Sequence, residues 1–275
     1  MVRIALFQSC TGIDPAANAQ ALTEAIGQAS AGNAEMLFTP EMSGLLDRDA
    51  KRAADNLRTE EDDQVLAACR EAASCHGLWL SLGSLAVRTD DSKLANRGFV
   101  IDPTGAVRAR YDKIHLFDVD LPTGESWRES SVYRAGEGAV VVEGTPLGRL
   151  GLTICYDLRF PDLFSRLSEA GAQAIAVPAA FTVPTGRAHW EVLLRGRAIE
   201  SEAFVIAAAQ SGHHTDGRDT YGHSLVVSPW GEVLLDMGQD TGVGFAEIEL
   251  SQIDEVRQRI PVLEHRRPID AATIR

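Results

Sequence analysis

Residues 150–162 read Leu150-Gly-Leu-Thr-Ile-Cys155-Tyr-Asp-Leu-Arg-Phe-Pro-Asp162, so a cysteine ends an apolar run. The run predicts a buried strand, and the segment after Cys155 predicts a turn that leads into a helix. At the start of a helix the backbone amides are unpaired, and the helix dipole favours a thiolate over a thiol. Cys155 is therefore a candidate nucleophile. Taken alone, it also fits a buried and inert cysteine, because free cysteine is among the most buried residue types.

Two other apolar runs end in a charged residue. Residues 36–41 predict a strand that delivers the Glu41 carboxylate, and residues 108–115 predict an extended segment that delivers the Lys113 ammonium. A carboxylate beside Cys155 can accept the thiol proton, and an ammonium can stabilise a thiolate and a later oxyanion. Each charge taken separately also fits the protein surface. Spacing alone does not bring the three residues together.

Strands alternate with helices along the whole chain. We predict strands over residues 2–8, 36–40, 78–86, 98–102, 107–111, 140–143, 150–154, 174–177, 205–209, 224–227, 233–236 and 244–248. Helices are predicted from Asp14 to about Gly32, from Thr59 to Gly77, over 189–200 and after Ile248, and residues 116–136 are predicted to form a long loop. Mixed strands covered by helices indicate an α/β sandwich. Residues 1–275 contain no linker or repeat, which predicts one domain with a core over about residues 2–268.

Composition agrees with an ordinary soluble enzyme, which we expect in the cytoplasm. The formal net charge of −13 argues against a nucleic-acid partner and against an anionic membrane surface. The first ten residues hold too short an apolar run for a signal peptide, and no apolar run is long enough to span a membrane. The four cysteines, Cys10, Cys69, Cys75 and Cys155, have no CxxC spacing, so neither a zinc site nor a disulfide framework is predicted.

Three motifs, taken in this chain order, resemble those of the nitrilase superfamily of carbon-nitrogen hydrolases. They are Phe38-Thr-Pro-Glu41, Tyr111-Asp-Lys113-Ile-His-Leu-Phe-Asp118 and Gly151-Leu-Thr-Ile-Cys155-Tyr-Asp-Leu-Arg-Phe-Pro161, and the resemblance runs from residue 2 to about 268. It implies a four-layer αββα sandwich that assembles as a homodimer or a higher homo-oligomer. It also implies a reaction that needs no metal or organic cofactor.

The same resemblance implies a role for each site residue. Glu41 corresponds to the general base, Lys113 to the oxyanion-stabilising cation and Cys155 to the nucleophile. The backbone amide of Tyr156 is expected to hold the oxyanion together with Lys113. Glu129 matches a second glutamate of the superfamily, and Glu125 nearby is the alternative for that position.

The second half of the chain is similar to the Nit branch of the superfamily. The similarity rests on Cys155-Tyr-Asp-Leu-Arg-Phe-Pro, on the predicted helix over 189–200, on Ala207-Ala-Ala-Gln-Ser-Gly-His213 and on residues 221–231. It implies an amidase that hydrolyses a small carboxylate-bearing amide, deaminated glutathione above all, through a cysteine thioester. The alternatives are an ω-amidase acting on α-ketoglutaramate, an N-carbamoyl amino acid hydrolase, a nitrilase and a catalytically silent scaffold of the same fold.

Several polar residues outside the three motifs carry further hypotheses. Arg187 stands where Nit proteins usually have proline, and it is a candidate cation for a second substrate carboxylate, although it also fits a solvent-facing arginine. Asp157 and Arg159 are predicted to orient the turn after the nucleophile. Five histidines offer a Cys-His dyad as an alternative to the glutamate base. They are His115, His189, His213, His214 and His223.

Overall fold

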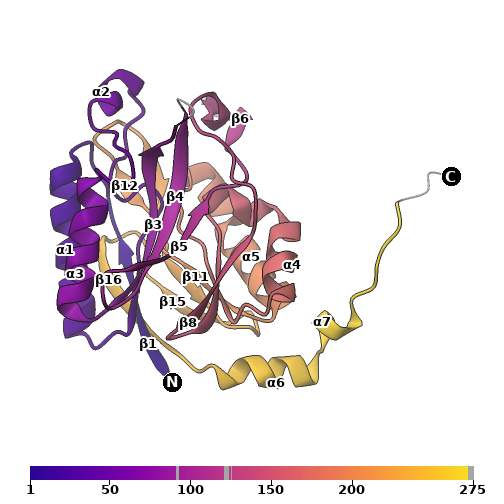
Figure 1. Cartoon of the computed structure of the whole chain (residues 1–275). Coiled ribbons are helices and arrows are strands. Elements are labelled where there is room, and N and C mark those ends of the chain that lie inside the picture. The colour runs from indigo at the N-terminus through magenta and orange to yellow at the C-terminus, as the bar shows by residue number, and fades with distance from the viewer. Residues whose placement is uncertain (91–92, 121–123, 125, 272–275) are drawn as a thin grey trace.

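Two six-stranded β-sheets pack face to face and carry helices on their outer faces. The computed structural model describes residues 1–90, 93–120, 124 and 126–271. Figure 1 shows α1 (Pro15–Ala31) and α3 (Gln64–His76) outside one sheet, and α4 (Pro161–Glu169) and α5 (Val183–Ser201) outside the other. The fold is thus the predicted four-layer αββα sandwich.

Both sheets have parallel strands at their centre and antiparallel strands at their edges. The first sheet has the order β16 (Gly242–Ile248), β1 (Val2–Gln8), β2 (Met36–Phe38), β3 (Trp79–Arg88), β4 (Leu94–Ile101), β5 (Val107–Asp112). The second has the order β15 (Val233–Asp236), β14 (Leu225–Val227), β11 (Phe204–Ala207), β10 (Ala174–Ala176), β9 (Gly148–Leu152), β8 (Val140–Thr145). Strands β1, β2 and β3 run parallel, as do β9, β10 and β11. Their carboxyl ends therefore meet at one end of the sandwich.

Side-chain alternation along the strands divides the apolar core in two. On β1, Ile4 and Leu6 point into the core between the sheets, while Ala5 packs against the helix side. On β2, Met36 and Phe38 face inward and Leu37 faces the helices. This period of two is what a strand with both faces covered requires. The predicted strands of this sheet are confirmed to within a few residues.

Helix boundaries follow the capping residues. Asp14 caps α1 by accepting a hydrogen bond from the backbone amide of Ala16, as predicted. The predicted start of the next helix at Thr59 is wrong by several residues, because the Asp63 carboxylate caps α3 by accepting from the amides of Val65 and Leu66, both at 2.9 Å. Gly77 ends that helix with a φ of +61°.

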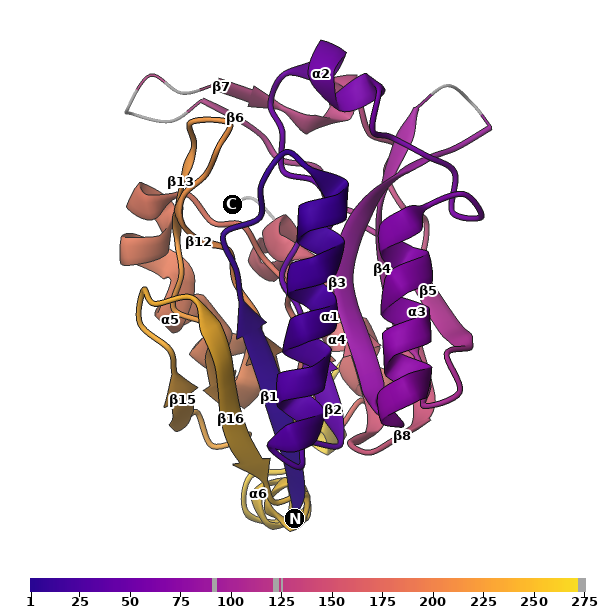
Figure 2. The same ribbon diagram turned by 90° about the vertical axis from the view of Figure 1, so that its left-hand side faces the viewer.

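Short elements outside the two sheets gather at the end where the parallel strands terminate (Figure 2). Within the predicted loop over 116–136, β6 (Asp118–Asp120) pairs with β7 (Ser126–Arg128), and a 3₁₀ turn over Glu129–Ser131 follows. A second unpredicted hairpin pairs β12 (Ser211–His213) with β13 (Asp219–Tyr221). Short α2 (Ala50–Ala54) lies at the same end.

The chain ends with α6 (Ser251–Arg259) and α7 (Val262–His265), which lie apart from the two helix layers (Figure 1). Of the helices that the structure describes, none is both long enough and apolar enough to cross a membrane.

Candidate active site

Cys155 lies just beyond the end of β9, where the chain makes a sharp turn. It opens a 3₁₀ turn over Cys155–Arg159, and the α-helix α4 begins only at Pro161. Its φ of +49° is rare for a residue with a Cβ. Such strain is typical of functional positions that the surrounding structure holds in place. The amide of Cys155 donates to the carbonyl of Pro178 at 2.9 Å, so the turn is fixed against the segment after β10.

A fully buried carboxylate ties this turn to the segment that carries Lys113. Asp157 Oδ2 accepts hydrogen bonds from the amide of Ile154 at 2.9 Å and from the Tyr111 hydroxyl at 2.7 Å. Asp157 Oδ1 accepts from the amide of His115 at 3.0 Å. Residues on both sides of Lys113 are thus anchored to the residue two positions after Cys155. The predicted role of Asp157 in orienting the turn is confirmed.

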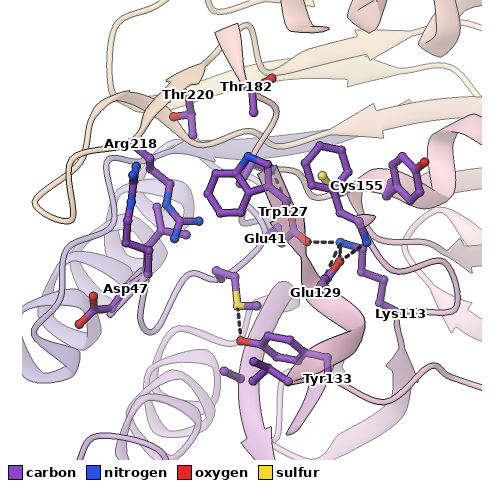
Figure 3. Close-up of a pocket in the computed structure, with 18 of the residues that line it drawn as sticks. Glu41, Asp47, Lys113, Trp127, Glu129, Tyr133, Cys155, Thr182, Arg218 and Thr220 are labelled. Atoms are coloured by element: carbon purple, nitrogen blue, oxygen red, sulfur yellow. Dashed lines mark hydrogen bonds and ion pairs between the residues drawn. The ribbon is translucent and has the colours of Figure 1, made fainter. Parts of the chain in front are cut away.

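The structure brings the predicted charged residues together. Lys113 Nζ lies 2.9 Å from Glu41 Oε1 and 2.9 Å from Glu129 Oε2 (Figure 3). The Lys113 side chain is 2% exposed, so the ammonium depends on these two carboxylates for neutralisation. The amide of Ala180 donates to Glu41 Oε2 at 3.0 Å, and the amide of Phe117 donates to Glu129 Oε2 at 2.6 Å. Glu125, the alternative to Glu129, lies outside the described residues.

Asn96 is a member of this cluster that the sequence analysis missed. Its Nδ2 donates to Glu41 Oε1 at 2.9 Å and to Glu129 Oε1 at 3.1 Å. Its Oδ1 is buried and has no hydrogen-bond partner among the described residues. A signal was present in the sequence: Asn96 and Val100 lie four residues apart on one face of β4, and Val100 packs into the core between the sheets. A polar residue at such a position needs a polar partner.

The environment of the sulfur keeps the resting thiol protonated. Burial raises the pKa of Cys155 well above its ordinary value, and the neighbouring Glu41 carboxylate raises it further, while Lys113 opposes them. The helix dipole expected to favour a thiolate does not act directly at Cys155, because a 3₁₀ turn begins there and α4 begins only at Pro161. Burial disfavours the charge on Lys113, but Glu129 and Glu41 outweigh burial and raise the pKa of Lys113.

A cavity of about 320 Å³ opens over this cluster. Its lining includes Glu41, Lys113, Glu129, Cys155 and Tyr156. The predicted role of the Tyr156 backbone amide stays a prediction. Arg187 is not among the lining residues, since it lies exposed on α5, and its proposed binding role also stays a prediction.

The cavity wall carries cations that the sequence analysis did not assign to binding. Arg159 lies with its Cζ 5.9 Å from the Tyr156 ring centroid and 5.5 Å from that of Phe181. Within the described part of the chain, no carboxylate lies within ion-pair distance of Arg159. The hydrogen bond that its side chain makes to a described residue joins Nη1 to His189 Nδ1, at 3.3 Å. Arg48, Arg128 and Arg218 also line the cavity.

Among the described residues, neither a histidine base nor a metal-binding group of side chains adjoins the sulfur. No histidine is among the described residues that line the cavity, so the structure does not form the alternative Cys-His dyad. His115 Nδ1 instead faces Asp157 Oδ1 at 2.7 Å, and its ring stacks on Phe160. Over the ranges that the structure describes, no three His, Cys, Asp or Glu side chains are arranged to hold a metal ion.

Comparison with known proteins agrees with this geometry. The family model of the carbon-nitrogen hydrolases matches residues 3–258. The chain is 39% identical over 267 residues to deaminated glutathione amidase of Yersinia enterocolitica, which covers 96% of this chain and 92% of that protein.

A fusion protein is a further relative. The chain is 42% identical over 266 residues to the nitrilase and fragile histidine triad fusion protein NitFhit of Caenorhabditis elegans, and the match spans 96% of this chain but only 60% of the fusion protein. The crystal structure of that protein matches with a TM-score of 0.89 at 40% identity, over 97% of this chain and 65% of the other. The order of the three motifs, the αββα fold and the family match agree, and the chain belongs to the carbon-nitrogen hydrolase family.

Proposed function

We propose that this chain is an amidase that hydrolyses a small carboxylate-bearing amide through a Cys155 thioester, with deaminated glutathione as its preferred substrate. The observation that carries the proposal is the buried Glu41–Lys113–Glu129 cluster, which adjoins the sulfur and lines the same cavity. A charged cluster of this kind is costly to bury, and acyl transfer gives each of its members a use.

Acylation begins with a proton transfer. Because the Cys155 thiol is protonated at rest, Glu41 takes the proton as the sulfur attacks the amide carbonyl. The carbonyl oxygen gains negative charge, which the Lys113 ammonium and the backbone amide of Tyr156 stabilise. The carbon–nitrogen bond then breaks. The departing amine takes the proton from Glu41, and the acyl group stays on the sulfur as a thioester.

Deacylation uses the same residues, with water as the nucleophile and the Cys155 sulfur as the leaving group. Glu41 takes a proton from a water molecule as the water oxygen attacks the thioester carbonyl. The carbon–sulfur bond breaks, the sulfur recovers a proton from Glu41, and the carboxylic acid leaves. In this cycle Glu129 is a positioning residue: its two oxygens hold Lys113 Nζ at 3.2 Å and 2.9 Å, so the ammonium keeps one place through both steps.

Arg159 is the proposed partner of the carboxylate on the acyl group. Its guanidinium lines the cavity beside Tyr156, the residue after the nucleophile, and has no carboxylate partner among the described residues. A guanidinium binds a carboxylate through two parallel hydrogen bonds, which fixes the orientation of the acyl chain as well as its charge. An acyl group with a carboxylate at one end and the scissile amide at the other suits this arrangement.

Deaminated glutathione is favoured over the other candidates by the names of relatives. The Yersinia enterocolitica protein and a human protein that is 38% identical over 271 residues are both named deaminated glutathione amidase. A cavity of about 320 Å³ is of the size that holds a small molecule. An ω-amidase, an N-carbamoyl amino acid hydrolase and a nitrilase would use the same nucleophile, so they differ from this proposal in substrate alone.

The test is a substrate panel with a common readout of product acid. It compares deaminated glutathione, α-ketoglutaramate, an N-carbamoyl amino acid and a simple nitrile, in the parent and in Cys155→Ala. We expect the highest kcat/KM for deaminated glutathione and no turnover in Cys155→Ala. A preference for the carbamoyl compound or the nitrile would overturn the substrate assignment, and the absence of turnover on all four would favour a silent scaffold.

We further propose that two copies of the chain associate through α5 in the cytoplasm. Val192 and Ile199 lie seven residues apart on α5, 72% and 50% exposed, and Trp230 on the neighbouring turn is 50% exposed. Arg195 Nε donates to the carbonyl of Gly231 at 2.8 Å, which holds this turn against the helix. An exposed apolar surface of this kind suits a self-complementary dimer contact.

The four cysteines are free thiols, which suits a reducing compartment such as the proposed cytoplasm.

A further inference from the structure

A second group of cations lies on the cavity wall, around Trp127. The guanidinium carbons of Arg218 and Arg48 lie 5.0 Å and 5.9 Å from the centroid of the Trp127 ring. Trp127 comes from β7, Arg218 from the turn between β12 and β13, and Arg48 from the segment before α2. All three residues line the cavity. In the view of Figure 3, Trp127 lies between Arg218 and Cys155.

One buried carboxylate holds both cations in place. Asp216 is fully buried, and its Oδ2 lies 2.7 Å from Arg218 and 3.9 Å from Arg48 Nε. The same oxygen accepts a hydrogen bond from the backbone amide of Arg48 at 3.0 Å. Two guanidinium groups therefore face a single negative charge, and the hydrogen bond to Asp216 fixes the orientation of Arg218 before any ligand arrives.

The other carboxylates at this end of the cavity already have partners. Asp47 forms a 2.7 Å ion pair with Arg52, and Asp219 contacts the His213 ring at 2.8 Å. Arg48 and Arg218 face one shared carboxylate, Asp216, so Asp216 balances only one of their two positive charges. A positive cavity wall of low polarity attracts and orients an anion.

The Trp127 indole supplies an independent indication of a ligand. Its Nε1 is buried and has no hydrogen-bond partner among the described residues. A buried N–H without an acceptor costs free energy, because it has given up its hydrogen bond to water. An oxygen of a bound ligand beside Trp127 would satisfy this donor while the two arginines neutralise the charge of the ligand.

A row of aromatic rings connects the cluster around Trp127 with the turn that carries Cys155. The Tyr156 and Phe117 rings lie 5.1 Å apart, and the Phe117 and Trp127 rings lie 6.4 Å apart. Trp127 also stands two residues before Glu129, which binds Lys113. The three rings therefore follow one another along the cavity lining, from the residue after the nucleophile to the cluster around Trp127.

We propose that Arg48, Arg218 and the Trp127 indole N–H form a subsite for a carboxylate at the far end of the departing amine. The inference rests on the proposed amidase function and gives that function its selectivity. Arg159 would bind the carboxylate of the acyl group, and the Trp127 subsite would bind the C-terminal carboxylate of a cysteinylglycine leaving group. An amide that releases only ammonia, such as α-ketoglutaramate, cannot use the subsite.

The test compares substrates that carry or lack the distal carboxylate of the departing amine. The substrates are deaminated glutathione, its C-terminal carboxamide, which lacks the distal charge, and α-ketoglutaramate, which lacks the whole amine fragment. The variants are Arg48→Gln, Arg218→Gln and Trp127→Phe. The control variant is Arg149→Gln, since Arg149 is exposed, pairs with Glu143 at 2.9 Å and does not line the cavity.

The expected result is a loss of selectivity for the distal carboxylate. The parent should prefer deaminated glutathione over the carboxamide by about tenfold or more in kcat/KM, the scale of one charge-assisted hydrogen bond. Arg48→Gln, Arg218→Gln and Trp127→Phe should each reduce that preference, and each should lower kcat/KM for deaminated glutathione by a larger factor than kcat/KM for α-ketoglutaramate. Arg149→Gln should match the parent on all three substrates.

Two different results would overturn the subsite. If the parent hydrolyses deaminated glutathione and its carboxamide equally well, or if Arg48→Gln and Trp127→Phe keep the preference, the amidase stands and the subsite is rejected. If the parent hydrolyses none of the three amides, the proposed function fails and the subsite fails with it. Arg218→Gln removes a partner of buried Asp216 and can unfold the turn, so Arg48→Gln, whose parent side chain is 45% exposed, is the decisive variant.

Discussion

Lys113 Nζ donates a hydrogen bond to Glu41 Oε1 at 2.9 Å, so the cation and the base of the proposed reaction are in direct contact before substrate binds. The contact gives Glu41, a carboxylate that is only 5% exposed, a partner of opposite charge. It also means that one substitution changes the charge balance of the whole cluster. The predictions below use that coupling.

Glu41→Gln should lower the pKa of the Cys155 thiol and yet reduce turnover. Removing the carboxylate takes away a group that raises the pKa of Cys155, so the thiolate should form at lower pH than in the parent. Turnover should nevertheless fall about a hundredfold or more, because no base remains to move protons. The rate of Cys155 alkylation as a function of pH measures the first effect, with exposed Cys10 as the internal reference. A thiolate that forms at higher pH in Glu41→Gln would contradict the charge arrangement.

Glu129→Gln should weaken the hold on Lys113 and leave the nucleophile in place. Glu129 contributes to the raised pKa of Lys113, so its loss should lower that pKa and bring the alkaline loss of kcat to lower pH. The sign follows because Lys113 acts as a cation: activity is lost as pH rises through its pKa and the positive charge disappears. A full pH profile of kcat in the parent and in the variant measures the shift. An unchanged alkaline limb would show that Glu129 does not position Lys113.

Asn96→Asp should be more harmful than Asn96→Ala. The aspartate places a third carboxylate within hydrogen-bond distance of both Glu41 and Glu129, and repulsion among buried like charges destabilises the fold. Asn96→Ala removes the donor and leaves a small void, so kcat should fall with a milder loss of stability. Thermal unfolding and kcat measured on both variants check the order. The reverse order in unfolding temperature would contradict the bridging of Glu41 and Glu129 by Asn96.

Val192→Glu should convert the proposed dimer into a monomer. A charge at a residue that is 72% exposed in the single chain costs little in the monomer, but in an apolar contact it would be buried without a partner. Light scattering on the parent and the variant reports the mass directly, and Val262→Glu on α7 is a control at another exposed apolar residue. A parent that is monomeric at micromolar concentration would refute the assembly.

The strands and the three site residues Glu41, Lys113 and Cys155 could be predicted from the sequence because each rests on a local pattern. Apolar runs gave β1 and β2 to within a residue or two, and the motifs around Glu41, Lys113 and Cys155 named the side chains that the structure brings together. The 3₁₀ turn at Cys155 and the balance of effects on the pKa of its thiol could not be predicted, because they depend on the positions of Glu41 and Lys113 in space.

The partners of residues that act through long-range contacts were also out of reach. The sequence marks Asn96 as a polar residue at a core-facing position, but its bond to Glu41 crosses a sequence separation of 55, and Arg48 and Arg218 meet at Trp127 from distant segments. Arg187 was chosen because it departs from a familiar pattern, but the cations on the cavity wall are others. A departure in sequence marks a difference from relatives, whereas only the fold shows which side chains share a cavity.

The central claim is the Cys155 thioester, and intact-mass measurement after rapid mixing with deaminated glutathione tests it most directly. We expect a transient mass increase equal to the acyl group, located on the peptide that contains Cys155. The adduct and the turnover should both be absent in Cys155→Ala and preserved in Cys10→Ala, Cys69→Ala and Cys75→Ala. Normal turnover in Cys155→Ala, or an acyl adduct on another residue, would contradict the account.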